Sequence, residues 1–533
     1  MQAWLSSSLV RHYPGSRPRK RSSLTLAAAR GESVSFQLAF RTEGTDRKVR
    51  AKISAPEALA VRVRRVGYVP MLHFSTETPA EELDGIGHVP GLVPDPLFPD
   101  QEIHAGPYET NAFWVNVDVP SDARPGRYRV TATLAAEGEE PVTLTSAVRV
   151  HRATLGPRRD FPVTHWFYAD ALCDWYRTEV WQESFWPILT AYLKDVVGHG
   201  QDTILVPAFT PPTDGVKKPT QLVGVSRDGD RYSFDWNLVR RWVKAAKAQG
   251  ITRFEWNHLF TQWGAKYAIR VYQGRGEGES LLWPPDTGGV SPTYRAFLSQ
   301  YLPEFRRFLE EEGLAESSFF HVSDEPHGDE HLANYRAARG MLRELAPWMK
   351  VMDALSQIQF AREGLTDIPI PITDQAPAFV REGFPAWTYF CCGPRGRYAN
   401  RLLDTPLTKV RMLGWLFYKN QARGFLHWGY NYWYKSQARE LINPYQVTDA
   451  KWWPGWCSGD PFVVYPGDDA PVDSLRWEVF GESLQDYALL QTAGLAPHDP
   501  LLAEIRDYAD FPRDERWVRS RRRELLRRAN QRA

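Results

Sequence analysis

Two carboxylic acids, Asp324 and Glu325, stand next to each other where a mostly apolar run at 318–322 approaches Pro326. Proline ends a strand, and a buried strand is an unfavourable place for carboxylates unless they open into a polar cleft. Adjacent acids repel each other, so we expect one of them to hold its proton to a higher pH. Cleavage of a glycosidic bond needs this division between a protonated acid and an ionised partner. The pair therefore predicts the active site of a glycoside hydrolase.

The spacing of the pair favours one kind of mechanism. In ordinary retaining glycosidases the acid and the nucleophile flank the bond at a separation of ~5 Å, whereas successive residues of a strand point to opposite faces unless the strand is ending. At a strand end, both acids can reach one cleft. Glu325 then protonates the glycosidic oxygen, and Asp324 orients the N–H of a 2-acetamido group whose carbonyl attacks C1. A structural alternative stays open on the motif alone: Asp324 caps the next helix and Glu325 forms a surface ion pair.

Other predicted strand ends carry aromatic and polar side chains that suit a sugar. Sugar rings stack their C–H faces on aromatic planes and need polar partners for their hydroxyls. Trp428 is the expected platform for the ring, and Tyr430 is the expected hydroxyl donor to the acetamido carbonyl. Core packing is the alternative for any single one of these side chains, so the argument depends on the set. The expected substrate-binding residues are Trp166, Tyr168, Asn257, His258, Tyr389, Trp428, Tyr430 and Asn431.

The composition is that of a globular protein with balanced charge. Lys plus Arg number 65 and Asp plus Glu 64, a net charge of +1, which gives no support for a nucleic-acid partner. The chain contains no Gly-rich phosphate loop, no Gly-x-Ser-x-Gly elbow and no His-Glu-x-x-His, so nucleotide hydrolysis, serine esterase chemistry and zinc hydrolysis lack their signatures. The four cysteines show no metal-binding spacing and are expected to be reduced thiols. We expect a glycan substrate and neither a metal nor another cofactor.

The chain of 533 residues is too long for one hydrophobic core, so several domains are expected. Residues 1–155 contain short runs of period-two alternation separated by Pro and Gly, at 33–41, 61–66, 112–119 and 126–134. This pattern predicts an N-terminal β-sandwich domain.

From 156 to 435, strands alternate with amphipathic helical stretches, which predicts parallel strands with helical crossovers. The expected strands are 163–168, 203–208, 253–260, 318–322, 351–355, 370–373, 387–391 and 424–430. The expected helices include 184–197, 236–248, 292–312, 329–345 and 407–422. Eight such repeats match a (β/α)8 TIM-type barrel, in which chemistry lies at the carboxyl ends of the strands. The predicted fold class is multidomain, β plus α/β.

Residues 436–533 are expected to form a C-terminal extension packed on the barrel, with a helix at about 474–491 and an Arg-rich terminal helix within 513–533. A nucleic-acid-binding tail is the alternative, but its single Trp makes a poor base-stacking platform. At the other end, the first residues lack the features of a signal peptide, and the chain has no apolar run long enough to span a membrane. We expect a cytoplasmic protein with no membrane partner.

Several motifs, taken in order, resemble glycoside hydrolase family 123. They are SDEP at 323–326, WTYFCCGP at 387–394, GFLHWGYNYW at 424–433, VYPG at 464–467 and SLRWEVF at 474–480, followed by Asp486 and Tyr487. The resemblance covers most of the chain, including a β-sandwich ahead of the barrel. It implies a retaining exo-β-N-acetylgalactosaminidase with substrate assistance, in which Asp324 stabilises the acetamido group and Glu325 is the acid/base. Two alternatives remain: a glycosidase of the same fold acting on another sugar, or a non-catalytic carbohydrate-binding protein.

Overall fold

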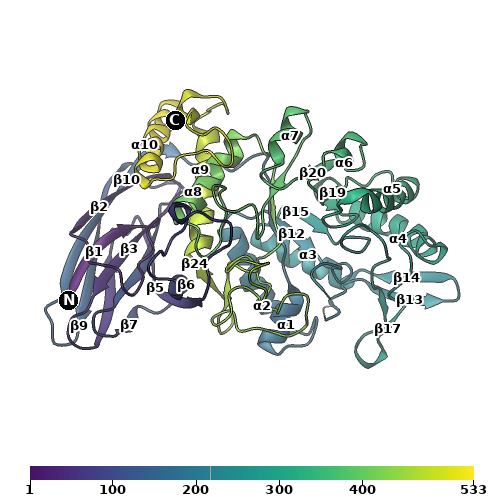
Figure 1. Ribbon diagram of the computed structural model, residues 1–533, viewed down its shortest axis with the longest axis horizontal. Helices are drawn as coiled ribbons and strands as arrows, with labels where there is room; N and C mark the ends of the chain where they lie inside the picture. Colours follow the sequence, from purple (N-terminus) through teal and green to yellow (C-terminus); the bar gives the residue numbers. More distant parts are fainter. Residues whose placement is uncertain (216–217) are drawn as a thin grey trace.

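The computed structural model describes residues 1–215 and 218–533. It divides the chain into a sheet-rich N-terminal region and an α/β region that follows it (Figure 1). The N-terminal strands lie at one end of the molecule and helices α4 (Pro292–Glu311) and α5 (Gly328–Leu345) lie at the other. The predicted combination of an all-β part with an α/β part is therefore confirmed.

The N-terminal region contains two sheets. The larger has seven strands in the order β1-β3-β8-β5-β6-β24-β23, and the smaller has five in the order β2-β10-β9-β4-β7. The four predicted runs coincide with β3, β5, β8 and β9. The bounds are β1 (Gln2–Ser7), β2 (Ser23–Arg30), β3 (Ser33–Arg41), β4 (Arg47–Ser54), β5 (Ala60–Met71), β6 (Gly91–Phe98), β7 (Glu102–Ala105), β8 (Thr110–Asp118), β9 (Gly126–Ala136) and β10 (Val142–Thr154).

The seven-stranded sheet is buried on both faces. Phe36 and Phe113 belong to a hydrophobic cluster that also takes Val130 and Leu134 from the five-stranded sheet. Trp114, the next residue of β8, belongs instead to the large cluster of the α/β region. Because successive strand residues point to opposite faces, one strand contributes to two cores. The sheet therefore forms a wall against which the α/β region packs.

Eight short strands follow in the α/β region. Pairing is parallel between β11 and β22, β12 and β15, β15 and β18, β19 and β20, and β21 and β22. Each lies within or overlaps one predicted strand and is shorter than predicted. Their bounds are β11 (Val163–His165), β12 (Thr203–Val206), β15 (Arg253–Trp256), β18 (Ser318–Phe320), β19 (Met352–Ala354), β20 (Ile368–Ile370), β21 (Thr388–Tyr389) and β22 (Phe425–His427).

Helices connect these strands. In α4, Pro292 occupies the first turn, where its missing N–H costs nothing, and the Ser291 side chain accepts from the N–H of Tyr294. The helix then buries one apolar face that includes Phe297 and Tyr301. The other helices are α1 (Ala169–Tyr176), α2 (Phe185–Gly198), α3 (Asn237–Gln249), α6 (Gln359–Arg362), α7 (Ala376–Arg381) and α8 (Leu407–Lys419); two hairpins, β13 (Gly224–Asp228) with β14 (Arg231–Asp235) and β16 (Tyr272–Gln273) with β17 (Ser280–Leu281), lie in the loops.

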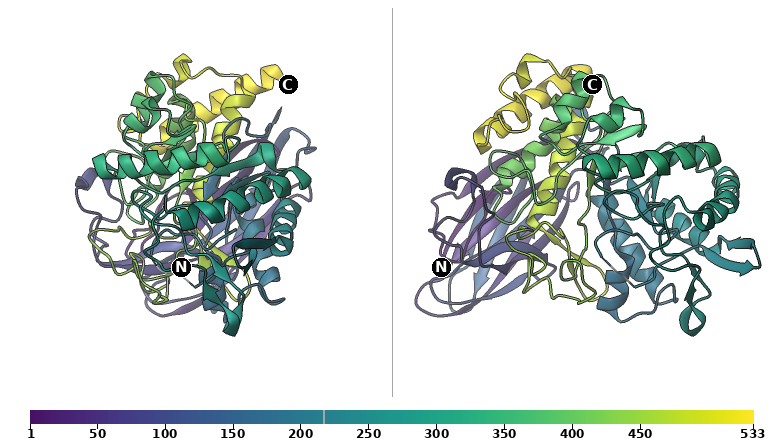
Figure 2. Two further views of the ribbon diagram at one scale, coloured as in Figure 1. Left: turned by 90° about the vertical axis from the view of Figure 1, so that its right-hand side faces the viewer. Right: turned by 45° about the vertical axis from the view of Figure 1, so that its right-hand side comes forward.

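The C-terminal part packs on both regions. Strands β23 (Tyr465–Pro466) and β24 (Pro471–Ser474) extend the seven-stranded sheet, with β24 antiparallel to β6. Helix α9 (Leu475–Thr492) is almost wholly buried, and α10 (Glu515–Arg532) lies beside β2 and β10 in all views (Figures 1 and 2). The side chain of Asn530 accepts from the N–H of Ala153 at 2.8 Å. Across the described residues, no helix combines the length and apolarity needed to cross a bilayer.

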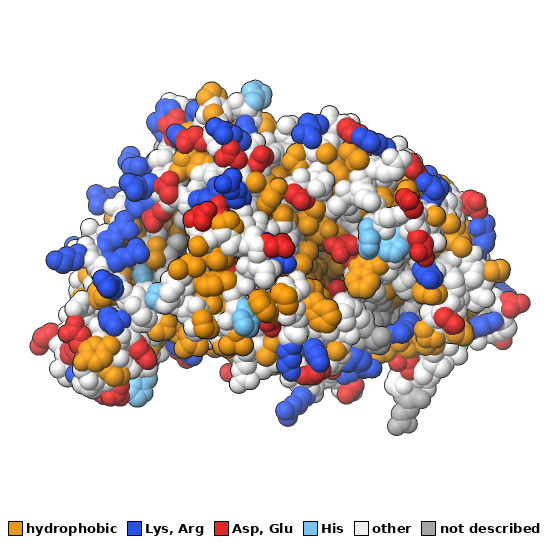
Figure 3. All heavy atoms as spheres, viewed as in Figure 1, with side chains coloured by type: hydrophobic (Ala, Val, Ile, Leu, Met, Phe, Trp, Pro, Cys, Tyr) orange, Lys and Arg blue, Asp and Glu red, His pale blue; other side chains and the backbone are white. Residues whose placement is uncertain are grey.

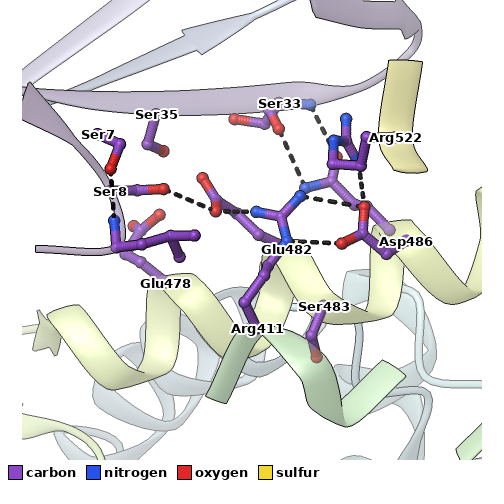
Figure 4. A network of polar contacts seen from close by, with 12 residues as sticks. Ser7, Ser8, Ser33, Ser35, Arg411, Glu478, Glu482, Ser483, Asp486 and Arg522 are labelled. Atoms are coloured by element: carbon purple, nitrogen blue, oxygen red, sulfur yellow. Dashed lines mark hydrogen bonds and ion pairs between the residues drawn. The ribbon is translucent and has the colours of Figure 1, made fainter. Parts of the chain in front are cut away.

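A buried ion network ties these helices to the N-terminal sheet (Figure 4). Arg411 of α8 donates to Glu482 and, at 2.6 Å, to Asp486, both on α9. Arg522 of α10 contacts Asp486 and also Glu32, in the turn between β2 and β3. All five side chains are buried. Since buried charges are costly unless each is paired, this network fixes α8, α9 and α10 relative to the sheet.

Candidate active site

A cavity of about 320 Å³ lies at the carboxyl ends of the α/β strands. Figure 3 shows a hollow near the middle of the visible face, with acidic side chains inside it. A larger groove of about 1120 Å³ lies between β2 and α10, but its lining is rich in arginine, and the adjacent acids in it, Asp514 and Glu515, begin α10, where Asp514 caps the helix. The smaller cavity is lined by Trp166, Asp214, Gln262, Trp263, Asp324, Glu325, Ala354, Tyr389, Cys391, Cys392, Leu426, Trp428, Ser436, Gln437, Trp452, Trp456 and Asp460.

The turn after β18 brings Asp324 and Glu325 to this cavity together. Glu325 has a φ of 44°, a left-handed conformation that is uncommon for a residue with a Cβ. Its N–H donates to the carbonyl of Ala354 at 3.0 Å, and the N–H of Trp263 donates to the carbonyl of Asp324 at 2.9 Å. The segments after β15 and at the end of β19 therefore hold the turn. Helix α5 starts only after His327, so Asp324 is not its cap.

Each carboxylate accepts a hydrogen bond from its own donor. Gln262 Nε2 donates to Asp324 Oδ2 at 2.8 Å, and the Tyr389 hydroxyl donates to Glu325 Oε1 at 2.7 Å. Asp324 is 4% exposed. The structural alternative of a helix cap and a surface ion pair is therefore wrong, because both acids turn inward onto uncharged donors.

The cavity raises the pKa of both acids. For Asp324, burial is the largest cause, and the charges of Glu325 and Asp214 raise its pKa further, well above the ordinary value. Burial also raises the pKa of Glu325, although the hydrogen bond from Tyr389 opposes the rise. Because the charges of the two acids interact, the two acids titrate together, and neither pKa can be assigned to one residue alone. The pair keeps a proton at a pH where isolated acids have both ionised, which is the state that acid catalysis requires.

A chain of hydrogen bonds leads from β11 to Asp324. The Tyr168 hydroxyl donates to Asp214 Oδ2 at 2.9 Å, and the N–H of Asp214 donates to Gln262 Oε1 at 3.0 Å. Gln262 then donates to Asp324. Asn431 exchanges hydrogen bonds of 2.9 and 3.0 Å with the backbone of Tyr168. Tyr168 and Asn431 thus lie behind the cavity wall and position Asp214, rather than lining the cavity as expected.

Beneath the cavity, Trp166 is held by buried charges. Its indole Nε1 donates to Glu255 Oε1 at 2.7 Å, and His321 bridges Glu255 and Asp353 at 2.7 and 3.0 Å. Burial alone would lower the pKa of His321, but the hydrogen bonds to Asp353 and Glu255 outweigh it and raise the pKa to about 10. His258 stacks on His321 with ring centroids 4.3 Å apart. Trp166 therefore lines the cavity as expected, whereas His258 lies below it.

Two of the expected substrate-binding residues lie elsewhere. The Tyr430 hydroxyl donates to Asp195 Oδ2 of α2 at 2.5 Å, and Tyr430 is fully buried and does not line the cavity. The Asn257 amide accepts from the N–H of Phe209 at 2.8 Å and donates to the carbonyl of His258 at 2.9 Å. The polar atoms of Tyr430 and Asn257 are therefore hydrogen-bonded to other groups of the protein and not directed at a substrate. The phenol that reaches one of the two acids is that of Tyr389.

Trp428 lines the cavity as expected, but the residues that contact it were not predicted. Its indole Nε1 donates to Asp460 Oδ2 at 3.1 Å, and its ring lies 4.7 Å from that of Trp456. Two further lining residues, Ala354 and Leu426, lie on β19 and β22. The other lining residues absent from the predicted set lie outside the helices and strands, where no periodic pattern indicates them. These are Asp214, Gln262, Trp263, Cys391, Cys392, Ser436, Gln437, Trp452, Trp456 and Asp460.

Two groups of side chains within the described residues are close enough to hold a metal ion: His258 with His321 and Asp353, and Asp195 with His199 and Asp473. Each already contains an ion pair of 3.0 Å, between His321 and Asp353 and between His199 and Asp195. Because the imidazoles of these pairs are hydrogen-bonded to carboxylates, we assign neither group to a metal.

Comparison with known proteins agrees with the chemistry of the cavity. The family model described as glycoside hydrolase 123, catalytic domain, matches residues 166–493, more than half of the chain. A solved structure of a family 123 glycoside hydrolase from Clostridium perfringens, described in connection with glycolipid glycan hydrolysis, superimposes with a TM-score of 0.75 at 15% identity. That match covers 99% of this chain and 97% of the other, and it shows a shared fold.

A second solved structure is more distant. A Bacteroides ovatus GH5 xyloglucanase in complex with a heptasaccharide gives a TM-score of 0.32 at 9% identity, over 88% of this chain and 98% of that one. No curated protein sequence matches the chain.

Proposed function

This chain belongs to glycoside hydrolase family 123, and on that premise we propose that it removes terminal β-linked N-acetylgalactosamine by retaining, substrate-assisted hydrolysis. The observation that carries the proposal is the pair of acids in one cavity, Asp324 buried and Glu325 partly exposed, each with a different donor. Adjacent acids on one turn are unsuited to flank a glycosidic bond as acid and nucleophile. They are suited to act on two neighbouring groups on the same side of one sugar.

In the first step, the acetamido carbonyl oxygen attacks C1 and the bond from C1 to the leaving oxygen breaks. Glu325 gives its proton to that oxygen, and Asp324 accepts the acetamido N–H as positive charge develops on the oxazolinium. An N–H donor favours the ionised form of Asp324, which leaves the shared proton of the pair on Glu325. In the second step, water attacks C1 and the bond from C1 to the oxazolinium oxygen breaks, which restores the acetamido group, while the Glu325 carboxylate takes the proton from that water. The two inversions retain the configuration.

The remaining side chains support this division of roles. Gln262 orients Asp324, and Tyr389 orients Glu325. Trp166 and Trp428 are anchored at their indole nitrogens by Glu255 and Asp460, so their rings are fixed as platforms for the apolar faces of a sugar. A side chain that contacts the substrate keeps its geometry when a second side chain behind it holds it by a hydrogen bond.

We also infer that the eight strands of the α/β region close into a (β/α)8 barrel, and that the two N-terminal sheets form a β-sandwich. The gaps between the paired strands are closed by isolated parallel bridges, one between Phe320 and Val351 and one between Ile372 and Tyr389. Contacts between β11 and β12 join the first two strands. On this proposal the domains are 1–155, 156–435 and 436–533. The acids then lie at the carboxyl face of the barrel, where such enzymes act.

An aryl glycoside panel tests the function. We expect hydrolysis of an aryl β-N-acetylgalactosaminide, inhibition by a thiazoline analogue of the sugar, and a rate at least about 100-fold lower in Glu325→Gln. Cleavage restricted to sugars without a 2-acetamido group would rule out the oxazoline route. Sugar binding without turnover, equal in wild type and Glu325→Gln, would identify a carbohydrate-binding protein instead.

A further inference from the structure

The Arg-rich terminal helix α10 borders the large groove that it forms with β2 and β10. Of the described residues that line this groove, none also lines the cavity around Asp324. The lining includes seven arginines and three acids, although the whole chain has a net charge of only +1. Figure 3 shows Lys and Arg side chains gathered on the flank of the molecule where Figure 1 places α10, β10 and β2. The groove is therefore a local concentration of positive charge, separate from the active site.

Helix α10 presents a stripe of arginines to this groove. Successive members are three or four residues apart, so one face of the helix carries all of them. At a rise of ~1.5 Å per residue, the stripe is about 16 Å long. Its members are Arg516, Arg519, Arg523 and Arg527.

The opposite wall of the groove adds a further cation. Strand β10 turns Val148 and Val150 into the core between the two sheets. Because successive strand residues point to opposite faces, Arg149 turns to the other side, where it lines the groove. Cations thus lie on both walls. We call the space between Arg149 and the stripe on α10 the arginine groove.

Three of these arginines have no partner within the part of the chain that the structure describes. Arg149, Arg516 and Arg523 are exposed, and none of them forms a hydrogen bond or an ion pair with another described residue. The guanidinium group is a planar fork of donors that binds two oxygens of one anionic group at once. Each of the three side chains is therefore available to bind an anionic group of a ligand.

The shape and the lining of the groove distinguish between classes of anionic ligand. A membrane presents a plane, which does not enter a space between a helix and a sheet. A single strand of nucleic acid needs aromatic faces on which its bases stack, but Trp517, the one Trp, Tyr or Phe among the described lining residues, is only 7% exposed. These two classes are therefore disfavoured.

An acidic peptide is disfavoured for a different reason. A bound peptide commonly extends a sheet by pairing with an edge strand, and β2 is the edge strand here. The carbonyls of Thr25 and Ala27 on β2 already accept from Arg519 at 3.4 Å and from Arg522 at 3.5 Å. Side chains of α10 thus occupy the backbone groups that an added strand would need.

We propose that the arginine groove binds a polyanionic glycan, a polysaccharide whose repeating sugars carry sulfate or carboxylate groups. Such a chain carries anions along its length, as the stripe on α10 carries cations. Leu9 and Leu26, both partly exposed in the groove, offer apolar surface to the faces of the sugar rings. The inference goes beyond the proposed function, because the groove would hold this glycan hydrolase on an anionic glycan whichever terminal sugar the cavity accepts.

Dextran sulfate and uncharged dextran test the proposal, because the two polymers share one backbone. Titration calorimetry of the full chain at about 0.1 M salt should show binding of dextran sulfate and none of dextran. The triple variant Arg149→Gln/Arg516→Gln/Arg523→Gln should bind dextran sulfate at least about 10-fold more weakly, since each exposed ion pair contributes about 2- to 5-fold. The variant should unfold in urea as the wild type does, because these three side chains have no partner to lose.

The matched control is Arg231→Gln/Lys244→Gln/Arg381→Gln. It removes the same charge from exposed side chains of β14, α3 and α7, none of which lines the groove. Charges separated by more than about 10 Å are largely screened at this salt concentration, so the control should bind dextran sulfate within about 2-fold of the wild type.

Four results would overturn the proposal. The first is a wild type that does not bind dextran sulfate, and the second is an equal loss of affinity in the two triple variants, because binding would then follow net charge alone. The third is tighter binding of polyglutamate or oligothymidylate than of dextran sulfate, lost in the groove variant, which would identify an acidic protein or a nucleic acid as the ligand. The fourth is a groove variant that hydrolyses an aryl β-N-acetylgalactosaminide more slowly than the wild type, because the three arginines would then belong to the active site.

Discussion

The hydroxyl of Tyr389, at the end of β21, donates a hydrogen bond of 2.7 Å to Oε1 of Glu325, in the turn after β18. Burial and then the charge of Glu325 raise the pKa of Tyr389 well above its ordinary value, so the phenol remains a donor at any working pH. A donor to a carboxylate stabilises its ionised form. Tyr389 therefore moderates the rise in pKa that burial imposes on Glu325, while also fixing the direction of its side chain.

Substitution of Tyr389 by Phe removes this donor and keeps the ring. We expect the pKa of Glu325 to rise further, so the alkaline limb of the kcat/KM profile, where the acid loses its proton, moves to higher pH. Activity should fall about 10-fold as the carboxylate loses its fixed orientation. The pH profile on an aryl glycoside measures both effects. An alkaline limb that moves to lower pH would contradict the assigned role. Tyr430→Phe is a control, because its hydroxyl contacts Asp195 outside the cavity.

Substitution of Glu325 by Gln separates acid catalysis from binding. The amide cannot protonate the leaving oxygen, so alkyl glycosides should lose at least about 100-fold in kcat/KM, which reports the first step. A dinitrophenyl glycoside, whose leaving group needs no proton, should lose much less in kcat/KM. Steady-state kinetics on both substrates give the two kcat/KM values. Equal losses on the two would show that Glu325 does not act as the acid. Glu330→Gln, in the first turn of α5, is the matched control, since Glu330 is exposed.

Substitution of Asp324 by Asn should stabilise the fold while it removes activity. The folded-state pKa of Asp324 is raised, so its contribution to stability is present below the unfolded pKa and is lost as pH rises through the folded one. The Asn side chain is uncharged, like the protonated acid, so the variant does not lose stability at this position as the pH rises. We expect the variant to melt at a higher temperature than wild type at about pH 8 and at the same temperature at about pH 4. A variant that melts lower than wild type at the higher pH would show that the ionised carboxylate is well stabilised in the cavity.

The strands of the α/β region could be predicted from sequence because each is a short apolar run bounded by turn residues, as the run before Pro326 is. The residues at which these strands end could not be predicted. The strand predicted at 253–260 ends at Trp256, since Leu259 and Phe260 continue beside His321 and Val322 with irregular backbone bonds. The pairing of β24 with β6 could not be predicted either, because the two segments lie far apart in the chain and no local pattern specifies a partner.

The position of the Asp324–Glu325 pair in the cavity was predictable because a carboxylate doublet after an apolar strand has few structural explanations. Its supporting residues were harder to predict. Trp428 and Tyr430 both follow β22, which ends at His427. Beyond that end the alternation of a strand no longer fixes direction, so Trp428 enters the cavity while Tyr430 turns to Asp195. Tyr389, the last residue of β21, lines the cavity as expected.

The ion network in Figure 4 predicts a strong stability effect far from the cavity. Arg522→Met leaves Glu32 and Asp486 without one of their cations inside the protein. Breaking a buried pair in this way costs about 3–5 kcal/mol. Urea unfolding followed by fluorescence measures the loss. Arg527→Met removes an exposed arginine from the same helix and should change stability little. Equal effects of the two variants would mean that the network contributes no more than a surface pair.

His321 makes the stability of the core beneath the cavity depend on pH. Its pKa is raised from 6.5 to about 10, so the stability it contributes is fully present below about pH 6.5 and is lost as pH rises through about 10. His321→Gln leaves Glu255 and Asp353 without a buried cation and should cost about 3–5 kcal/mol at about pH 6. The difference between wild type and variant should shrink steadily towards pH 10, because a neutral imidazole no longer balances the two acids. Chemical unfolding of both proteins across this range gives the curve. A difference that stays constant with pH would show that His321 is neutral in the folded protein and that the three side chains are held by a shared proton instead.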